Sequence, residues 1–505
     1  MADTPSSQDL SFTEALALAN DMRERGDLSA AEQLCREIAA QTPAAADLLH
    51  LQALIAAQRK RPQDAVRFML RALGMAPDAE EFYRNFVNIC RLRFGAQADR
   101  PLEDFDDAFR DPSIPDTAAL TRLLTSLGEI DHAVALVQQW HAAGRASARD
   151  LQTVGYWLNE TGAFAAAYRC FALAHQLAPE DPKIARFLAT ATMRQGDLAQ
   201  GLALYERRWD LEFFRTVFRD FPFPVWQGEP LKDRALLAWT EQGIGDQIMQ
   251  SRALGSLGQT ADLVVECDPR LFPLLRRSYP HARYHAQTVE PDPELTSGAF
   301  DFHTSLLSAW RWLLPDGLRP PAAAPYLTAD PARVDALRQH WSMGAKDGPL
   351  HVGLSWRSKQ ADRGPGRSVD PFLLAPLLND RRLKVYSLQY DASDADITEL
   401  NRDLGSGLIA VPDIDMKNDL DGVAALMTAL DLVISVDNTT VHLAGALGTP
   451  TWVMLNHRHD WRWLDGGPTT PLYESLRLYR QTARGQWGDV MVSLMADMED
   501  LLSLR

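Results

Sequence analysis

Residues 431–450 read DLVISVDNTTVHLAGALGTP, and this is the most specific pattern in the chain. The apolar, β-branched run at 432–436 predicts a buried strand, and the polar residues at 437–440 predict a direct turn into a helix. Gly448 and Pro450 then end that helix. A buried strand that turns straight into a helix is typical of a parallel α/β sheet, in which ligands bind at the carboxyl ends of the strands.

The start of this helix is a candidate phosphate site. Backbone amides and the hydroxyls of Thr439 and Thr440 meet at the positive end of the helix dipole, where they would form a cradle for a diphosphate. Asp437, Asn438 and His442 belong to the same segment. The competing interpretation is ordinary helix capping by these polar side chains.

Similar strands and helices alternate before and after this segment. The predicted strands fall into two groups, at 235–239, 263–267 and 300–304 and at 351–355, 385–389, 408–411, 432–436 and 451–455. Each group predicts a Rossmann-like lobe. We therefore expect a first lobe at 231–345, a second lobe at 346–485, a helix at 486–505, and a cleft between the lobes.

The turn after the first strand, Glu241 to Gln247, reads EQGIGDQ. Gly243 and Gly245 allow a tight turn and a close approach of the backbone to a ligand. Asp246 starts the following helix at the rim of the expected cleft, although a helix-capping carboxylate would look the same. His303 ends another strand of this lobe and could face an acceptor, but a single histidine is more often structural.

A basic loop at 355–368, SWRSKQADRGPGRS, follows the first strand of the second lobe. It holds four cations within eleven residues, among them Arg357 and Lys359, which would neutralise phosphates and a departing nucleoside diphosphate. A solvated flexible loop is the alternative. Gln389 ends the next strand and could read a base or a ribose. The aromatic loop at 460–463 is expected to pack near the cleft.

The first 210 residues follow a different pattern, with a period of 34. A glycine turn and a later proline recur at fixed phases, the glycines at 26, 128, 162 and 196 and the prolines at 43, 77 and 179. Two periods lack the glycine, and Lys60 and Phe94 stand at the corresponding positions. The acidic stretch at 99–115 is expected to be a loop or a degenerate unit. Small residues at Gly155, Ala167 and Ala174 would let paired helices approach closely. Such pairs stack into a superhelix whose groove holds a partner.

Composition limits the functions that this chain can have. A length of 505 residues predicts several domains, and a net charge of −16 disfavours general nucleic-acid binding. The sequence predicts no secretion signal and no run of ~20 apolar residues for a membrane span. Four scattered cysteines fit a reducing compartment, so we expect a cytoplasmic protein.

The N-terminal pattern resembles the tetratricopeptide repeat over about residues 10–210. Residues 230–490 resemble the heptosyltransferase-type glycosyltransferases of the GT-B fold, through Gly245-Asp246 and the segment 435–450. The resemblance implies a multidomain chain, with an all-α tetratricopeptide superhelix at 1–210, a linker at 211–230, and an α/β GT-B part of two Rossmann-like lobes.

The same resemblance assigns roles to residues. Asp246 matches the general base, which takes a proton from the acceptor hydroxyl, with His303 as a weaker candidate. Donor-site positions match Asp437, Thr439, Thr440 and His442. The family implies a nucleotide-sugar donor as co-substrate, no other cofactor and no required metal. Two Asp-x-Asp pairs, at 394–396 and 413–415, lie in the wrong places for a metal-dependent sugar transferase, so no metal site is predicted.

Repeats joined to GT-B lobes are similar in layout to protein O-linked sugar transferases and to bacterial flagellin glycosyltransferases. That layout implies a metal-independent protein O-glycosyltransferase whose array recruits the protein acceptor, with flagellin as one candidate. The array, Asn438 where threonine is more usual, and the basic loop at 357–367 argue against a heptose donor and a lipid acceptor. A lipopolysaccharide or other non-protein sugar transferase, and a non-catalytic adaptor with a decayed transferase lobe, remain alternatives.

Overall fold

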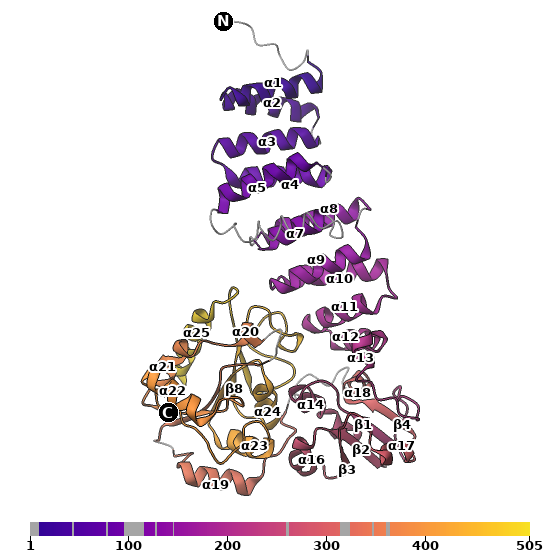
Figure 1. The fold of residues 1–505 in the computed structure, drawn as a ribbon, viewed down its shortest axis with the longest axis vertical. Helices are drawn as coiled ribbons and strands as arrows, with labels where there is room; N and C mark the ends of the chain where they lie inside the picture. Colours follow the sequence, from indigo (N-terminus) through magenta and orange to yellow (C-terminus); the bar gives the residue numbers. More distant parts are fainter. Residues whose placement is uncertain are drawn as a thin grey trace. The chain divides into compact units, whose positions relative to one another are not determined.

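The computed structural model describes residues 10–504 apart from a set of short gaps: 43–44, 77–78, 95–115, 127–128, 145, 259–261, 314–323, 346–347 and 360–363. Its contacts divide the chain into two units, Met1–Ile184 and Ala185–Arg505 (Figure 1). Several predictions fall outside the described residues, namely the loop at 99–115, the turn glycine at 128, the prolines at 43 and 77, and Arg363.

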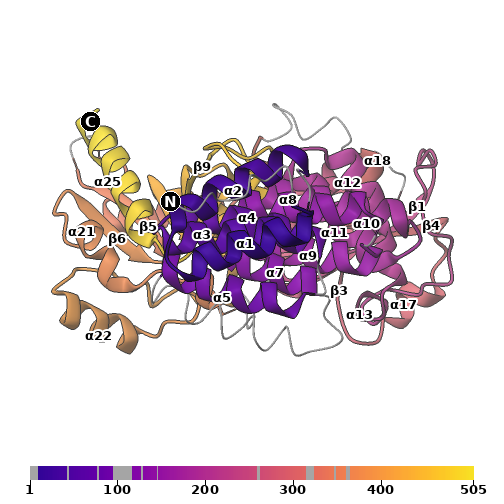
Figure 2. The ribbon, with the colours of Figure 1, turned by 90° about the horizontal axis from the view of Figure 1, so that it is seen from above.

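The first unit is a series of helix hairpins, seen from above in Figure 2. The first helices of the four described pairs are α1 (Phe12–Glu24), α3 (Ala46–Gln58), α7 (Asp116–Ser126) and α9 (Ala148–Glu160), and a further helix, α5 (Glu80–Phe94), follows the second pair. The second helices are α2 (Leu28–Gln41), α4 (Pro62–Met75), α8 (Ile130–Ala142) and α10 (Phe164–Leu177). The predicted array of paired helices is therefore present. Its identity as a tetratricopeptide superhelix stays a prediction.

The hairpin turns have a left-handed residue at one fixed position. Gly26, Gly162 and Gly196 have φ angles of 87°, 79° and 94°, and Lys60 takes φ of 58° at the corresponding place. Glycine adopts this conformation freely, which is why it recurs in the sequence. Lys60 forms the same turn at a cost of roughly 1–2 kcal/mol, so the repeat continues through a frame without glycine.

Close packing within the clearest pair is confirmed. A Cβ atom on Gly155 of α9 would lie 2.7 Å from Cε1 of Phe171 and 3.1 Å from Cβ of Cys170, both on α10. Ala167 and Ala174 of α10 are fully buried. The small side chains that the sequence places here are therefore required by the distance between the two helices.

The second unit begins within a helix pair that the sequence assigned to the repeats, α11 (Pro182–Arg194) and α12 (Leu198–Tyr205). Met193 and Leu202 of this pair share one hydrophobic core with Leu236 and Ile248 of the first α/β lobe. The pair therefore belongs to the α/β unit by packing, and this unit starts before the predicted boundary at residue 210.

The first lobe is a parallel four-stranded sheet in the order β3-β2-β1-β4. Its strands are β1 (Ala235–Trp239), β2 (Asp262–Cys267), β3 (Ala282–Ala286) and β4 (Phe302–Ser305). Its helices are α14 (Ile244–Gln250), α15 (Ala253–Leu257), α16 (Phe272–Ser278), α17 (Pro293–Ser297) and α18 (Leu306–Leu313). The segment before β1 contains two short helices: η2 (Glu206–Asp210), at the end of the predicted repeats, and α13 (Glu212–Arg215), within the predicted linker at 211–230.

The second lobe is a parallel five-stranded sheet in the order β6-β5-β7-β8-β9. Its strands are β5 (Leu350–Ser355), β6 (Leu383–Ser387), β7 (Leu432–Val436), β8 (Thr451–Leu455) and β9 (Leu476–Arg480). Its longer helices are α19 (Pro331–Trp341), α22 (Asp394–Leu404), α23 (Leu420–Ala429), α24 (Thr439–Leu447) and α25 (Trp487–Ser503).

One strand prediction for this lobe needs correction. The run at 408–411 forms only one isolated bridge, between Ile409 and Tyr386 of the edge strand β6. Pro412 follows at once and has no N–H to continue a ladder. Strand β9 of this lobe and strand β3 of the first lobe were not predicted. The two parallel sheets themselves are confirmed, and they form an α/β part preceded by a helical region. None of the described helices is long and apolar enough to cross a lipid bilayer.

Candidate active site

A cavity of about 550 Å³ in the second unit brings together residues from all three sequence motifs. The motif residues that line it are Gln242, Gly243, Gly245 and Asp246, Asp437, Asn438, Thr439 and His442, and Ser358 and Arg367. Its other lining residues are Phe213, Phe214, Val217, Ile244, Tyr390, Asp460 and Arg462. The ends of β1, β5 and β7 therefore open into one space, as expected for ligand sites in parallel sheets.

Asp246 lies in the first turn of α14, with a quarter of its side chain exposed. Its Oδ2 atom accepts a hydrogen bond from the backbone N–H of Gly243 at 3.2 Å, so it does cap this helix. Its Oδ1 atom lies 2.5 Å from a guanidinium nitrogen of Arg462 in the other lobe. Burial raises the pKa of Asp246, and the charge of Arg462 opposes that rise. A carboxylate with a raised pKa on a cavity wall is suited to proton transfer.

Arg462 connects the two lobes at this point. It lies on the short helix η5 (Trp461–Trp463) and donates a second hydrogen bond to Asp460 at 2.5 Å. The guanidinium carbon lies 4.8 Å from the ring centroid of Trp461. Among the described residues, its Nε atom has no hydrogen-bond partner. The sequence suggested only packing for this loop, because a basic residue between two tryptophans is not a recognisable motif.

Asn438 fixes the turn at the start of α24. Its Oδ1 atom accepts a hydrogen bond from the backbone N–H of Thr440 at 2.9 Å. Its Nδ2 atom donates to Oγ of Ser355, at 2.9 Å, and to the carbonyl oxygen of Arg357, at 3.3 Å. The side chain therefore caps the helix and ties the end of β7 to the end of β5.

Arg367 is the cation of the basic loop that lines the cavity, as far as the loop is described. Its guanidinium lies 3.1 Å from a carboxylate oxygen of the buried Asp437. It ends the short helix α20 (Gly364–Arg367), where a Cβ atom on Gly364 would lie 2.3 Å from the carbonyl oxygen of Ser358. Only glycine fits there, and it allows the loop to turn Arg367 toward α24.

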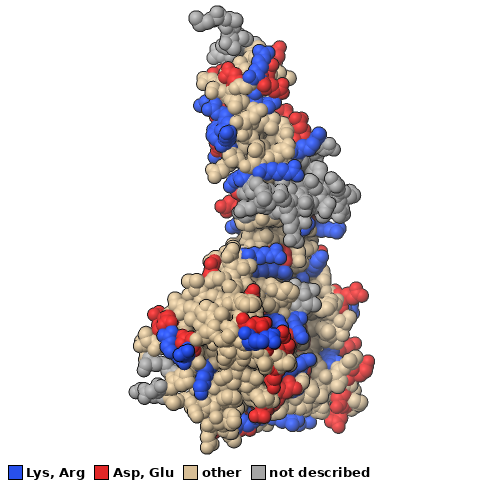
Figure 3. Space-filling view, turned by 60° about the vertical axis from the view of Figure 1, so that its left-hand side comes forward, with Lys and Arg blue, Asp and Glu red and all other residues tan. Residues whose placement is uncertain are grey.

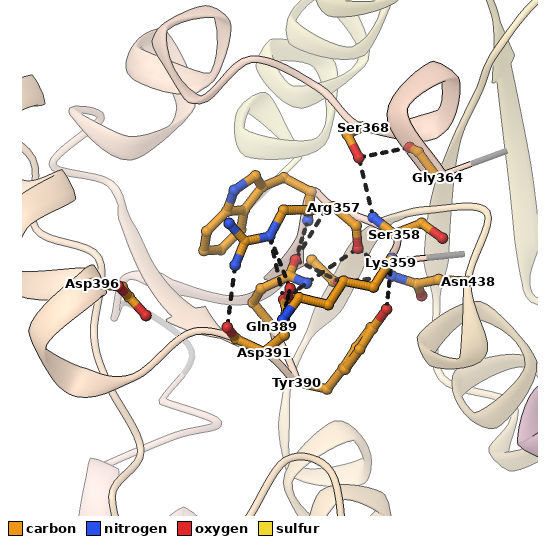
Figure 4. Close-up of polar contacts among 12 residues, drawn as sticks. Arg357, Ser358, Lys359, Gly364, Ser368, Gln389, Tyr390, Asp391, Asp396 and Asn438 are labelled. Carbon is orange, nitrogen blue, oxygen red and sulfur yellow. Dashed lines mark hydrogen bonds and ion pairs between the residues drawn. The ribbon is translucent and has the colours of Figure 1, made fainter. Parts of the chain in front are cut away.

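Arg357 and Lys359 are not among the residues that line the cavity. Nε of Arg357 lies 3.1 Å from Oδ2 of the buried Asp391, and Nζ of Lys359 lies 3.4 Å from the same oxygen (Figure 4). The nearby carboxylate holds these two cations on its own side of the loop. Their contact with phosphates stays a prediction.

Gln389 is buried beneath this loop, and its side-chain amide forms several hydrogen bonds that hold the loop in place (Figure 4). Its Oε1 atom accepts hydrogen bonds from the backbone N–H groups of Trp356 and Arg357, both at 3.0 Å. Its Nε2 atom donates to Asp391 at 2.6 Å and to the carbonyl oxygen of Arg357 at 3.1 Å. The amide is fully used inside the lobe, so reading a base would require it to break some of these bonds.

His442 lines the cavity in a neutral form. Its Nδ1 atom lies 2.9 Å from the hydroxyl of Tyr473, and its ring stacks on Trp463 with centroids 5.5 Å apart. Burial lowers the pKa of His442 to about 3. A Cβ atom on Gly245 would lie 3.0 Å from Cδ2 of His442, so this glycine permits the close approach of α14 to α24.

His303 lies outside the cavity, in the core of the first lobe. It is buried, its Nδ1 atom lies 3.3 Å from Nε1 of Trp239, and Phe221 packs edge-on against its ring. Burial lowers the pKa of His303 to about 4. Its position favours Asp246 over His303 as the residue that meets an acceptor.

A smaller, mainly apolar pocket of about 240 Å³ adjoins the cavity, sharing Ile244, Tyr390 and Thr439 with it. Thr440 lines this second pocket, together with side chains such as Leu388. The two spaces meet at the start of α24, so a ligand with a charged part and a flat apolar part could occupy both.

Both Asp-x-Asp pairs contain a carboxylate that accepts hydrogen bonds from nearby residues of its own segment. Asp396 accepts hydrogen bonds from the backbone and hydroxyl of Ser393 in the capping box of α22, at 2.8 and 2.9 Å. Asp415 accepts from the backbone N–H groups of residues 417 and 418. The described residues contain one other grouping with metal-ligand chemistry, formed by His285, Asp292 and Glu294, and none of these three lines the cavity.

Comparison with known proteins gives one related sequence and several structural likenesses. No family model matches the chain. Protein FlbA of Caulobacter vibrioides is 31% identical in an alignment of 339 residues that covers 64% of this chain and 56% of that protein. The chain therefore spans little more than half the length of the curated relative that it matches.

Three solved structures are similar at low identity. A glycosyl transferase of family 9 from Veillonella parvula has 9% identity and a TM-score of 0.40, over 55% of this chain and 99% of its own. The ADP-heptose lipopolysaccharide heptosyltransferase II of E. coli has 14% identity and a TM-score of 0.38, over 54% and 100%. A mutant O-GlcNAc transferase from Thermobaculum terrenum has 14% identity and a TM-score of 0.31, over 99% and 92%. With all three TM-scores below 0.5, the functional argument rests on the site itself.

Proposed function

We propose that this chain is a glycosyltransferase that moves a sugar from a nucleotide-activated donor to a hydroxyl of a protein acceptor. The observation that carries the proposal is the composition of the cavity. It combines a carboxylate of raised pKa, Asp246, with two guanidinium groups, Arg367 and Arg462, and with the start of α24. These are the groups that transfer to a hydroxyl from a diphosphate donor requires.

In this proposal the donor diphosphate lies at the start of α24. The backbone there and the hydroxyl of Thr439 bind phosphate oxygens, and Arg367 and Arg462 supply positive charge. The nucleoside base enters the adjoining apolar pocket past Ile244 and Tyr390. The two arginines neutralise the departing diphosphate, so the reaction needs no metal and no further cofactor.

Asp246 takes the proton of the acceptor hydroxyl as the new glycosidic bond forms. Arg462 keeps the carboxylate charged before the reaction. When Arg462 turns toward the departing diphosphate, Asp246 loses its cation and becomes a stronger base at the moment when the proton must leave the acceptor. His303 has no part in this scheme, because it lies outside the cavity.

The helical array has the task of recruiting the acceptor protein, of which flagellin is one candidate. Arrays of paired helices that each contact only their neighbours form extended surfaces that bind polypeptides. In this proposal the array is a tetratricopeptide-type superhelix, and the protein acts where nucleotide sugars are made, in the cytoplasm.

The proposal is tested by thermal unfolding of the purified chain with nucleoside diphosphates and CMP. A nucleotide that binds the folded state raises the melting temperature by mass action. We expect one nucleotide to do so in the wild type and in Arg402→Ala, which removes an exposed surface arginine, and to lose the effect in Arg367→Ala. If none of these nucleotides changes the melting temperature, the chain is better explained as an adaptor.

A further inference from the structure

One side of the cavity is an apolar wall made of Phe213, Phe214 and Val217. Phe213 is 75% exposed and Val217 is 45% exposed, which is unusual for side chains of this size. Single exposed apolar residues are common on proteins, but here three line the same cavity as Asp246. The wall comes from the segment that the sequence predicted to be a linker.

This wall is held rigidly against the first lobe. Just before it, Arg208 and Glu241 form a fully buried ion pair with an N–O distance of 2.7 Å. The ring of Trp209 lies 5.5 Å from that of Trp239 in β1 and packs edge-on against Phe214 at 6.5 Å. The exposure of Phe213 is therefore a property of an ordered surface and not of a loose connection.

In the proposed function, the nucleotide of the donor makes no contact with this wall. In the proposed binding mode the diphosphate lies against cavity residues such as Arg367 and Asn438, and the base lies in the apolar pocket beside α24. Phenylalanine and valine side chains have no hydrogen-bond donor or acceptor for the hydroxyl groups of a donor sugar. The apolar wall therefore faces the other substrate, the acceptor.

The surroundings of the wall favour a polypeptide over a lipid. Exposed charged residues, Glu212 and Arg215, lie within and beside it, and they would interrupt contact with an acyl chain. The chain has a net charge of −16, which repels anionic lipid headgroups. On the face in Figure 3, acidic and basic side chains are interspersed over the described part of the second unit.

We infer that the wall of Phe213, Phe214 and Val217 binds an apolar side chain of a polypeptide acceptor, next to the hydroxyl residue that receives the sugar. The inference rests on the proposed function and deepens it by naming a local preference in the acceptor sequence. The helical array would bind the acceptor protein, and the wall would determine which hydroxyl residue of that protein receives the sugar.

The test uses the full chain and fluorescein-labelled nonapeptides with one central serine, flanked on both sides by leucine, glutamine or aspartate. Their binding is measured by fluorescence anisotropy. We expect the leucine-flanked peptide to bind about tenfold more tightly than the glutamine-flanked one, which is about 1.4 kcal/mol. Phe213→Ala should remove this preference. Phe372→Ala, which truncates a phenylalanine that is 66% exposed and does not line the cavity, should keep it.

Equal binding of all three peptides would overturn the inference, and so would a leucine preference that persists in Phe213→Ala. Vesicles of phosphatidylcholine and phosphatidylglycerol are tested in parallel. Vesicle binding that is lost in Phe213→Ala, without any peptide preference, would assign the wall to a lipid instead. Nucleotide binding by the wild type is a separate readout. If it fails while the peptide preference holds, the transferase proposal falls and the wall remains a peptide site.

Discussion

The contact between Asp246 and Arg462 is the most informative pair of residues in the site. Burial raises the pKa of Asp246, and Arg462 lowers it. A general base works only in its deprotonated form, so the transfer rate must fall as the pH drops through the pKa of Asp246. We predict that Arg462→Gln moves this acid limb of the pH–rate profile to higher pH.

The measurement is kcat/KM as a function of pH for transfer, once the donor is known. Arg477→Gln, at an arginine that is half exposed and paired with Asp497 on the surface, is the control and should leave the limb in place. A limb that stays where it is in Arg462→Gln would show that another group takes the proton.

Sequence alone identified the cavity residues at the strand ends. It did not show which cation of the basic loop lines the cavity. Asp246 and Asn438 were found because their positions follow from a strand that turns into a helix. The basic loop offered several arginines, and it is the packing of Gly364 and the burial of Asp391 that direct Arg367 into the cavity and hold Arg357 away from it. These are long-range contacts, which local patterns do not contain.

Helices α14 and α24 meet at Gly245, and their distance controls the shape of the site. A Cβ atom there would lie 3.0 Å from His442 and 3.4 Å from Cα of Thr439. His442 is held by Tyr473 and Trp463, so it cannot move aside freely. We predict that Gly245→Ala weakens nucleotide binding by about tenfold or more, roughly 1–3 kcal/mol, by forcing these helices apart.

Isothermal titration with the active nucleotide measures this effect. Gly255→Ala in α15 is the matched control, because the nearest side-chain atom to a Cβ atom there is 3.7 Å away, an ordinary contact. Nucleotide affinity in Gly245→Ala equal to that in Gly255→Ala would mean that the two helices do not set the donor site.

The η2 helix anchors the turn that carries the candidate base. Arg208 in η2 is fully buried and pairs with Glu241, which precedes the turn at 242–246, and with Glu206 at 2.6 Å. Removing one partner leaves a buried charge unpaired, so Arg208→Ala should lower the free energy of unfolding by about 3–5 kcal/mol. Urea unfolding measures this, with Arg402→Ala as a surface control. A loss below 1 kcal/mol would show that the pair is not structural.

Elements with a strong periodic pattern were predicted well, and short ones were not. The helix α13 has four residues and no period, so the two phenylalanines of the wall, which it carries, were assigned to a linker. The run at 408–411 has the composition of a strand, but Pro412 and its place beyond the edge strand limit it to one bridge. In both cases tertiary contacts, and not local propensity, decide the structure.

At the scale of the whole molecule, the helices α11 and α12 link the repeats to the α/β unit by sequence and stabilise the site by packing. Arg194 donates a hydrogen bond to the carbonyl oxygen of His459, and Gln195 donates one to Asp465, on either side of Arg462. Arg208 supports the turn before Asp246. Both walls of the cavity therefore depend on residues that precede position 210.

We predict different outcomes for two N-terminal truncations. Removal of residues 1–180 keeps Asp181, which caps α11 through the backbone N–H groups of Lys183 and Ile184, and should leave the nucleotide-induced rise in melting temperature intact. Removal of residues 1–210 should abolish it. If the shorter chain still binds nucleotide, the two helices are dispensable for the donor site.

The most direct test of the account is the replacement Asp246→Asn, followed by two measurements on the same preparation. One is the nucleotide-induced rise in melting temperature. The other is release of the nucleoside diphosphate from its sugar conjugate in the presence of acceptor. The account predicts an unchanged rise in melting temperature and a rate that falls by about 10²–10⁴-fold, because asparagine keeps the size of the side chain but cannot accept the proton. Transfer at the wild-type rate would contradict the assignment of Asp246 as the base.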